Sequence, residues 1–249
     1  MTATALVGND AAQERARMRA VRRYDILDTP PDGSFDRVTR LAAKLLHAPI
    51  AIVTIVDHDR IWFKSRYGIE AEEITRDPGL CASAILHDEP WVVEDARRDP
   101  RALANPLVAG EFGLQFYAGA PLRTVDGHNL GTLCVIDMEP RVFGDTERSV
   151  LADLADIVVD ELELRLAARD VETSVRERQA LMEERQRQAL QLNDDVVQAL
   201  AVAKMELQMG VNADIGARID HALESGKRIL ADMASDARSL RRDETGPIV

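Results

Sequence analysis

The sequence predicts an α+β protein in which an antiparallel sheet with flanking helices is followed by one long helix. All ten aromatic residues and nine of the ten prolines lie before residue 144, so a globular domain is expected to end there. Two pairs of apolar, β-rich runs flank turn signals at 57–60 and 125–129, a pattern typical of β-hairpins. Residues 147–209 contain neither glycine nor proline, which predicts a helix of about 95 Å if it is unbroken.

Composition restricts the classes of function. The chain has 249 residues, 46 % of them hydrophobic, and carries 31 basic and 43 acidic side chains for a net charge of −12. This size suits one or two domains with a sizeable core. The excess of acid argues against binding to nucleic acid or to an anionic membrane. No apolar run reaches the ~18 residues of a membrane span and the start lacks a signal-peptide pattern, so we expect a cytoplasmic protein.

The first half of the predicted domain contains helices and a hairpin. The opening to Asp25 is expected to form a short charged helix that ends at the turn cluster 28–33. Ser34 is expected to cap the next helix. The turn at 57–60 then joins two strands. The second helix is predicted to bury one apolar face, made of Phe35, Val38, Leu41, Ala42 and Leu45.

The second half alternates short elements with a second hairpin. Residues 81–90 predict a brief helix, and residues 91–95 predict a short strand. The stretch 97–110, rich in Arg, Asp and Pro, is expected to be a long polar loop. The strands on either side of 125–129 are FYAGAPLRT and LGTLCVIDME. Asp145 or Thr146 is expected to cap the long helix.

Several stretches together resemble the GAF sensory domain. They are YDILDTPPDGSFDRVTRLAAKLL, PIAIVTIVDHDRIWFKSRYG, LCASAI, NPLVAGEFGLQFYAGAPL and LGTLCVIDMEPR, in that order. The resemblance covers residues 22–165. It implies a central antiparallel sheet sandwiched by helices. Many members bind a small molecule between the sheet and its covering loops, whereas others bind nothing and act as dimerising spacers, so the fold alone does not decide function.

A ligand pocket, if present, has a small set of candidate residues. The pairs Trp62–Phe63 and Phe116–Tyr117 are each adjacent on a strand, so only one member of each pair can face a cavity, and a purely structural core is the alternative. Cys81 begins the short helix, where it is either a reactive thiol or a packed one. Asp95 and Arg97 lie in the long loop, where they either cover a pocket or are solvated. The candidate pocket residues are Trp62, Cys81, Asp95, Arg97, Phe116 and Tyr117.

The sequence does not identify a metal site or a cofactor. The only cysteines, Cys81 and Cys134, lack metal-ligand spacing, and we expect two reduced thiols, with Cys134 in the core. The five histidines are scattered. No metal is therefore predicted, and the identity of any ligand stays open.

Apolar spacing near the end of the chain predicts a helical hairpin. Residues 215–233 carry small and apolar side chains at 4-3-4-3-4 intervals, and residues 196–207 carry them at 4-3-4 intervals. The stretch 210–212 would turn the chain between these helices. Two antiparallel hairpins, one from each of two chains, would form a dimeric four-helix bundle.

The predicted hairpin resembles the dimerisation and phosphotransfer domain of sensor histidine kinases. Residues 192–198 read LNDDVVQ, so Asn193 stands where that family has its phosphorylated histidine. An amide cannot accept the phosphoryl group in this way, which makes the motif of Asn193, Asp194 and Gln198 degenerate. Asn193 is expected to specify the register of the bundle, to form a partner-docking surface with the neighbouring acids, or to have no role.

These inferences predict a domain order and a function. The order is a charged segment (1–21), a GAF sensor (22–165), a connecting coiled coil (166–189), a degenerate dimerisation hairpin (190–240) and a tail (241–249). The function is that of a cytoplasmic homodimeric signalling protein, not an enzyme, which senses a small molecule or redox state and docks a signalling partner on the hairpin. The alternatives are a phosphotransfer protein that works with a separate kinase and carries phosphate on His221 or another histidine, or a thiol-based redox enzyme that uses Cys81.

Overall fold

The computed structural model describes residues 3–77, 79–103 and 105–209, and after these only residues 216, 217, 219, 220, 223, 224 and 227. The chain divides into two compact units, Met1–Arg169 and Asp170–Val249. Helix α5 (Asp145–Gln208) contributes to both units.

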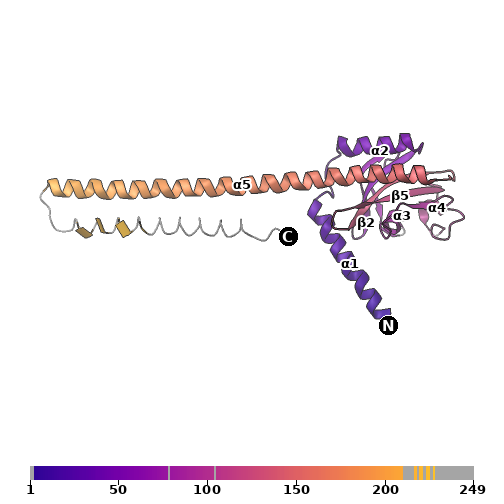
Figure 1. The fold of residues 1–249 in the computed structure, drawn as a ribbon, viewed down its shortest axis with the longest axis horizontal. Coiled ribbons are helices and arrows are strands. Elements are labelled where there is room, and N and C mark those ends of the chain that lie inside the picture. Colours follow the sequence, from indigo (N-terminus) through magenta and orange to yellow (C-terminus); the bar gives the residue numbers. More distant parts are fainter. Residues whose placement is uncertain are drawn as a thin grey trace. The chain divides into compact units, whose positions relative to one another are not determined.

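The first unit is built on a six-stranded sheet (Figure 1) in which neighbouring strands are antiparallel, in the order β3-β2-β1-β6-β5-β4. The hairpins predicted around 57–60 and 125–129 are the pairs β1–β2 and β6–β5. This arrangement confirms the predicted α+β class with an antiparallel sheet. The strands are β1 (Ile50–Val56), β2 (Arg60–Tyr67), β3 (Glu73–Thr75), β4 (Trp91–Val93), β5 (Phe116–Arg123) and β6 (Asn129–Asp137).

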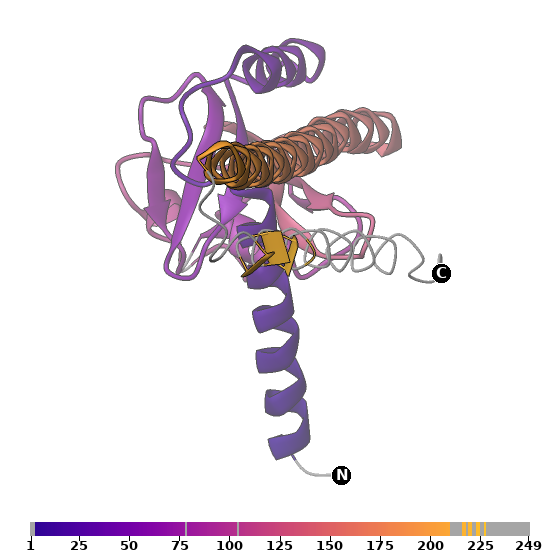
Figure 2. The ribbon, with the colours of Figure 1, turned by 90° about the vertical axis from the view of Figure 1, so that its left-hand side faces the viewer.

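Both faces of this sheet are covered, so every residue of β1 and β6 is buried. Helices α1 (Ala3–Tyr24) and α2 (Gly33–Leu45) and the first turns of α5 pack on one face (Figures 1 and 2). The short helices α3 (Leu80–Ala84) and α4 (Pro106–Ala109) cover the other face. Because side chains alternate along a strand, each strand contributes to two separate cores. We call the core beneath α1, α2 and α5 the helix-side core, and the core beneath α3 and α4 the cavity-side core.

Helix α2 differs from its prediction in its cap and in its buried face. Asp32, not Ser34, is the N-cap, because its carboxylate accepts a hydrogen bond from the backbone N–H of Ser34 at 2.9 Å. Leu41 and Leu45 are 41 % and 56 % exposed, so the predicted apolar face was wrong at these two positions. The buried residues of α2 are Phe35, Val38, Thr39, Ala42 and Ala43.

Two short elements, helix α4 and strand β3, lie in stretches of the sequence that have no strong periodic pattern. The predicted loop 97–110 contains helix α4, whose first turn is capped by the Asn105 side chain at 2.8 Å from the N–H of Leu107. Strand β3 adds three residues at the sheet edge beside β2. Both elements close over the cavity-side core and help to form the site described below.

Helix α5 is one unbroken helix of 64 residues, which confirms the predicted long helix. It begins at Asp145, and Glu147 accepts a hydrogen bond from the backbone N–H of Gly144 at 3.1 Å. The predicted turn at 210–212 and most of the predicted second hairpin helix, His221 included, lie outside the described residues. Among the helices that the structure describes, none combines the length and the apolar character needed to cross a membrane.

Candidate functional site

A cavity of about 140 Å³ lies in the cavity-side core, between the sheet and helices α3 and α4. Its walls come from five strands, from both short helices and from the loops that join them. The lining is apolar except for one tyrosine and two thiols, so water inside it finds few hydrogen-bond partners. The lining residues are Ile52, Phe63, Ile69, Ala71, Ile74, Leu80, Cys81, Leu107, Phe112, Leu114, Tyr117, Cys134 and Ile136.

Two sulfur atoms meet in the wall of this cavity. The Sγ atoms of Cys81 and Cys134 are 4.0 Å apart, and both residues are buried free thiols. Cys134 is held in the middle of the sheet, where it pairs with Ile52 on β1 and with Gly119 on β5. Cys81 lies in the single turn of α3. The fold therefore joins two thiols that are 53 residues apart in the sequence.

The Tyr117 hydroxyl is the unpaired polar group of the cavity wall. Its ring is 1 % exposed and packs edge-on against Trp91, with ring centroids 5.7 Å apart, while its hydroxyl makes no hydrogen bond of ordinary length and angle. The Cys81 thiol and the Thr132 hydroxyl are close enough to affect its pKa. The hydroxyl lies over Gly119, where a Cβ atom would overlap it. Thr54 and Thr132 are buried nearby in the same core and share a hydrogen bond of 3.0 Å between their hydroxyl oxygens. An unpaired hydroxyl inside a protein is costly unless a ligand or water satisfies it.

Contact between the two thiols makes them chemically unequal. A hydrogen bond from Cys134 lowers the pKa of Cys81, against the opposing effect of burial. The same hydrogen bond, together with burial, raises the pKa of Cys134. Burial also raises the pKa of Tyr117, and negative charge at Cys81 raises it further. Cys81 is the more accessible of the two sulfurs, since it is 6 % exposed whereas Cys134 is fully buried.

The structure separates the six candidate pocket residues into three places. Cys81 and Tyr117 line the cavity. Trp62 and Phe116 belong to the helix-side core, so Phe63 and Tyr117 are the members of the two aromatic pairs that face the cavity. Asp95 and Arg97 follow β4 and do not line it.

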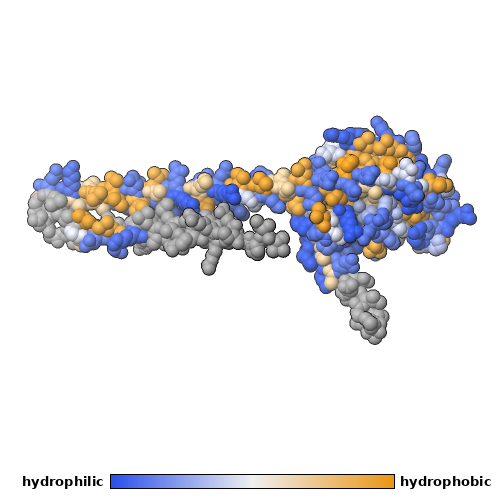
Figure 3. Space-filling view, viewed as in Figure 1, coloured by the Kyte–Doolittle hydropathy of each residue, from blue (hydrophilic) through white to orange (hydrophobic). Residues whose placement is uncertain are grey.

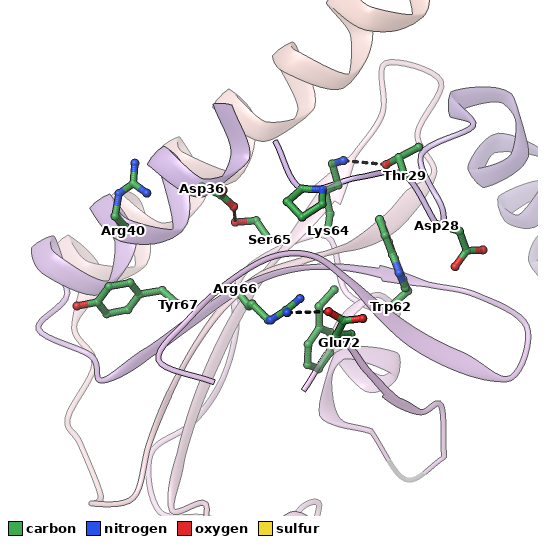
Figure 4. A pocket seen from close by; sticks show the side chains of 12 residues that line it. Asp28, Thr29, Asp36, Arg40, Trp62, Lys64, Ser65, Arg66, Tyr67 and Glu72 are labelled. Atoms are coloured by element: carbon green, nitrogen blue, oxygen red, sulfur yellow. Dashed lines mark hydrogen bonds and ion pairs between the residues drawn. The ribbon is translucent and has the colours of Figure 1, made fainter. Parts of the chain in front are cut away.

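Trp62 borders a different hollow, of about 510 Å³, beside α2 and β2 (Figure 4). Of the charged groups that line it, Lys64, Arg66, Glu72, Asp28 and Asp36 already have partners within the chain, whereas Arg40 is exposed without one among the described residues. The buried Lys64 donates to the Thr29 hydroxyl at 2.7 Å and to the Pro30 carbonyl at 2.8 Å, and burial lowers its pKa. Arg66 pairs with Glu72 at 2.8 Å, as Figure 4 shows. This hollow is therefore the weaker candidate for a ligand site.

The loop after β4 forms an open surface depression. Asp95 lines it beside Asp99 and Arg101, and these last two form an ion pair at 2.5 Å. Arg97 is exposed, and its backbone N–H donates to the Asp95 carboxylate at 3.2 Å. The guanidinium of Arg101 also stacks on Trp91, 5.0 Å from the ring centroid, which ties this loop to the wall that holds Tyr117.

Residues 192–198 lie in the second unit. Asn193, Asp194 and Gln198 are all exposed on α5, whereas Ala203 is buried. Across the residues that the structure describes, no three His, Cys, Asp or Glu side chains gather as ligands for a metal ion.

The sequence did not predict that Cys81 contacts Cys134, or that Gly119 leaves space for the Tyr117 hydroxyl. Part of this cluster could have been found in the sequence. Thr132 and Cys134 are two residues apart on one apolar strand and so share a face, and Thr54 is a polar residue within another apolar run. No local pattern places Cys81 against that face, because the contact is set by the path of the chain between β3 and β4.

The architecture is an antiparallel sheet covered on both faces, with a small apolar cavity under the short helices. Residues 30–162, more than half of the chain, match the family model of the GAF domain. The chain belongs to the GAF domain family, as its resemblance predicted.

Known proteins that resemble this chain match only part of it. A cyclic di-GMP phosphodiesterase of Pseudomonas aeruginosa is 42 % identical over 128 residues, which are 51 % of this chain and 22 % of that protein. The chain thus spans about a fifth of the length of this curated relative.

Among solved structures, the GAF domain of an Acinetobacter phosphoenolpyruvate-protein phosphotransferase has a TM-score of 0.47 at 17 % identity, covering 67 % of this chain and 97 % of that one. The free methionine-R-sulfoxide reductase of Neisseria meningitidis in complex with its substrate has a TM-score of 0.46 at 18 % identity, covering 64 % and 93 %.

Proposed function

We propose that the chain is a cytoplasmic homodimeric signal-transduction protein whose cavity binds a small, mostly apolar molecule and whose helix α5 relays that event. The observation that carries this proposal is the cavity of about 140 Å³ with the unpaired, buried hydroxyl of Tyr117 in its wall. In this account the chain acts by binding and relay, not as an enzyme. The relative named as a phosphodiesterase supports a signalling context for this kind of domain.

The cavity restricts the size and chemistry of its ligand. An apolar cavity of about 150 Å³ in another protein stays dry and binds benzene or xenon, so this one suits a molecule of a few heavy atoms. The Tyr117 hydroxyl offers one donor and can accept. The ligand we expect is therefore an apolar ring or branched chain with a single hydrogen-bonding group.

The relay that we propose crosses one layer of the sheet. Tyr117 faces the cavity, and the preceding residue, Phe116, faces the helix-side core. There its ring packs against Phe143, at 5.4 Å between centroids, two residues before α5 begins. A ligand that shifts β5 would thus move the residues that hold the start of α5. The α5 residues buried in the same core are Leu151, Leu154, Ala155, Val158, Val159 and Leu162.

A repeated apolar stripe on α5 supports the proposed homodimer. Ile157, Leu164, Val171, Val175 and Met182 are between 47 % and 69 % exposed. With Ala168 they follow spacings of 7, 4, 3, 4 and 7 residues, the periodicity of a coiled-coil seam. Figure 3 shows such apolar side chains recurring between charged ones along α5. A second copy of the same helix is the partner that a self-complementary stripe fits best.

The C-terminal part of the proposal is a degenerate, non-phosphorylatable dimerisation hairpin. It rests on the resemblance of residues 192–198 and on Asn193 at the phosphoacceptor position. The exposure of Asn193, Asp194 and Gln198 on α5 suits a surface that a signalling partner docks on.

Native mass spectrometry of the freshly purified full chain tests ligand and stoichiometry together. The proposal predicts a dimer of the 27.6 kDa chain that carries extra mass, lost on denaturation. A Tyr117→Phe variant should retain less of that mass and remain a dimer. A monomer at micromolar concentration would contradict the proposed homodimer. An empty dimer that gains no mass from small apolar alcohols or phenols would contradict the proposed ligand binding.

A further inference from the structure

The two cysteines of the chain meet at the wall of the cavity, with Sγ atoms 4.0 Å apart. We propose that Cys81 and Cys134 form a reversible disulfide when hydrogen peroxide enters the cavity. This modification site deepens the proposed sensing role and depends on it for its biological meaning. The bond itself can be tested separately.

The geometry requires one small movement. A disulfide has an S–S distance of about 2.05 Å, so the two sulfurs must approach by about 2 Å. Cys134 is fixed by hydrogen-bonded strands on both sides. Cys81 lies in a one-turn helix that begins after Gly79, so rotation of its side chain and a slight shift of α3 can supply the movement. The change is therefore expected on the α3 side of the cavity.

Access is provided by the cavity itself. Cys81 is 6 % exposed and Cys134 is fully buried, so bulky reagents do not reach the sulfurs from the surface of the folded protein. Both residues nevertheless line the cavity of about 140 Å³, which has room for a molecule of the size of hydrogen peroxide. The site thus admits small oxidants and excludes large ones.

The chemistry is a two-step oxidation that begins at Cys81. Its thiolate attacks one oxygen of the peroxide, the O–O bond breaks, and hydroxide leaves and takes a proton to become water, which leaves a sulfenic acid on Cys81. The Cys134 sulfur then attacks the Cys81 sulfur. The S–S bond forms, the S–O bond breaks, and hydroxide leaves with the proton of Cys134 as a second water.

Electrostatics favour this order. The hydrogen bond from Cys134 lowers the pKa of Cys81 and leaves Cys134 as the protonated partner. Geometry favours the same order, because Cys81 is 6 % exposed in a one-turn helix whereas Cys134 is fully buried between two strands. Net, two thiols and one peroxide give one disulfide and two waters, and an added dithiol reverses the reaction.

Intact mass analysis of the full chain tests the proposal. The reduced protein is exposed to hydrogen peroxide, then unfolded with N-ethylmaleimide and weighed. We expect a species of monomer mass, lighter by two hydrogens, that takes up no maleimide and that takes up two after treatment with dithiothreitol. Because the chain has only two cysteines, this species identifies the Cys81–Cys134 bond.

Two variants test the order of attack. Cys134→Ala should accumulate a sulfenic acid on Cys81 that dimedone labels, whereas Cys81→Ala should lose most of the labelling of the remaining thiol. Labelling of Cys134 in the second variant at the rate of Cys81 in the first would overturn the assignment. Peptide mapping separates these products from oxidised methionine.

The wild-type protein alone can refute the proposal. Two maleimides on the peroxide-treated chain, a sulfinic acid on Cys81, or a disulfide only between two chains would each overturn it. The proposed ligand function fails on a different result, an empty dimer in native mass spectrometry, so the two failures are distinguishable.

Discussion

The hydroxyl of Tyr117 occupies the space that a side chain at Gly119 would fill. The two residues share a face of β5 and lie beside Cys134, which pairs with Gly119 across the sheet. The absence of one Cβ atom thus lets a polar group reach the cavity wall in an otherwise apolar core.

Gly119→Ala should destabilise the protein by about 1–3 kcal/mol, because the new methyl group forces the Tyr117 ring out of its packed position. Urea denaturation measures the change. Gly33→Ala is the matched control, since a Cβ there meets nothing within 4 Å, and its effect should stay within about 0.5 kcal/mol. Equal stability of the two variants would show that the hydroxyl does not need this space.

Tyr117→Phe and Tyr24→Phe should shift stability in opposite directions. The first removes a buried hydroxyl without a partner and is expected to stabilise the ligand-free protein by about 1 kcal/mol. The second removes a hydroxyl that donates to the Glu163 carboxylate at 2.6 Å and should cost about 1 kcal/mol. Thermal unfolding of both variants checks this, and a loss for Tyr117→Phe comparable to that for Tyr24→Phe would mean that the Tyr117 hydroxyl is satisfied.

The docking of α1 should depend on pH through Glu14. Hydrogen bonds from Arg17, which itself donates to the Val56 carbonyl at 2.7 Å, and from Arg76 lower the pKa of Glu14 to about 2. Because this folded-state pKa lies below the ordinary value of 4.5, the stabilisation is present above pH 4.5 and is lost as the pH falls toward 2.

Glu14→Gln should therefore lower the free energy of unfolding near neutral pH. The side chain is 37 % exposed, so we expect less than about 1 kcal/mol after solvent screening. The gap to wild type should close at acid pH in urea titrations. Glu89→Gln, at an exposed position, serves as the control and should change stability little at either pH.

Val171→Glu should weaken the proposed dimer, because it places charge in the exposed apolar stripe of α5. Thr173→Glu is the control, since it adds the same side chain on the same turn but off the stripe. Sedimentation equilibrium should show at least a tenfold weaker association for the first variant alone. Equal association of the two variants would mean that another surface joins the chains.

Much of the fold follows from local pattern. The hairpins around 57–60 and 125–129 and the uninterrupted α5 carry strong periodic or turn signals, and each forms where the sequence indicates. Strand β3 and helix α4 are only three and four residues long, too short to show periodicity. Leu41 and Leu45 were misplaced because only the packing of α2 on the sheet decides which apolar stripe is buried.

The site was less predictable than the fold. Cys81 and Tyr117 lie where a pocket was expected, but adjacency alone cannot say whether Phe116 or Tyr117 faces the cavity when both sheet faces are apolar. The contact between Cys81 and Cys134 joins a helix to a distant strand. Such contacts depend on the whole topology.

Hydrogen exchange of the full chain with and without phenol tests the relay most directly. Phenol is an apolar ring with one hydroxyl, which matches the cavity and the unpaired Tyr117 group. The account predicts slower exchange at α3 and β5 and also in the buried turns of α5 from Leu151 to Leu162, with a smaller effect in Tyr117→Phe. Slower exchange confined to the cavity elements, or none at all, would contradict the claim that the cavity communicates with α5.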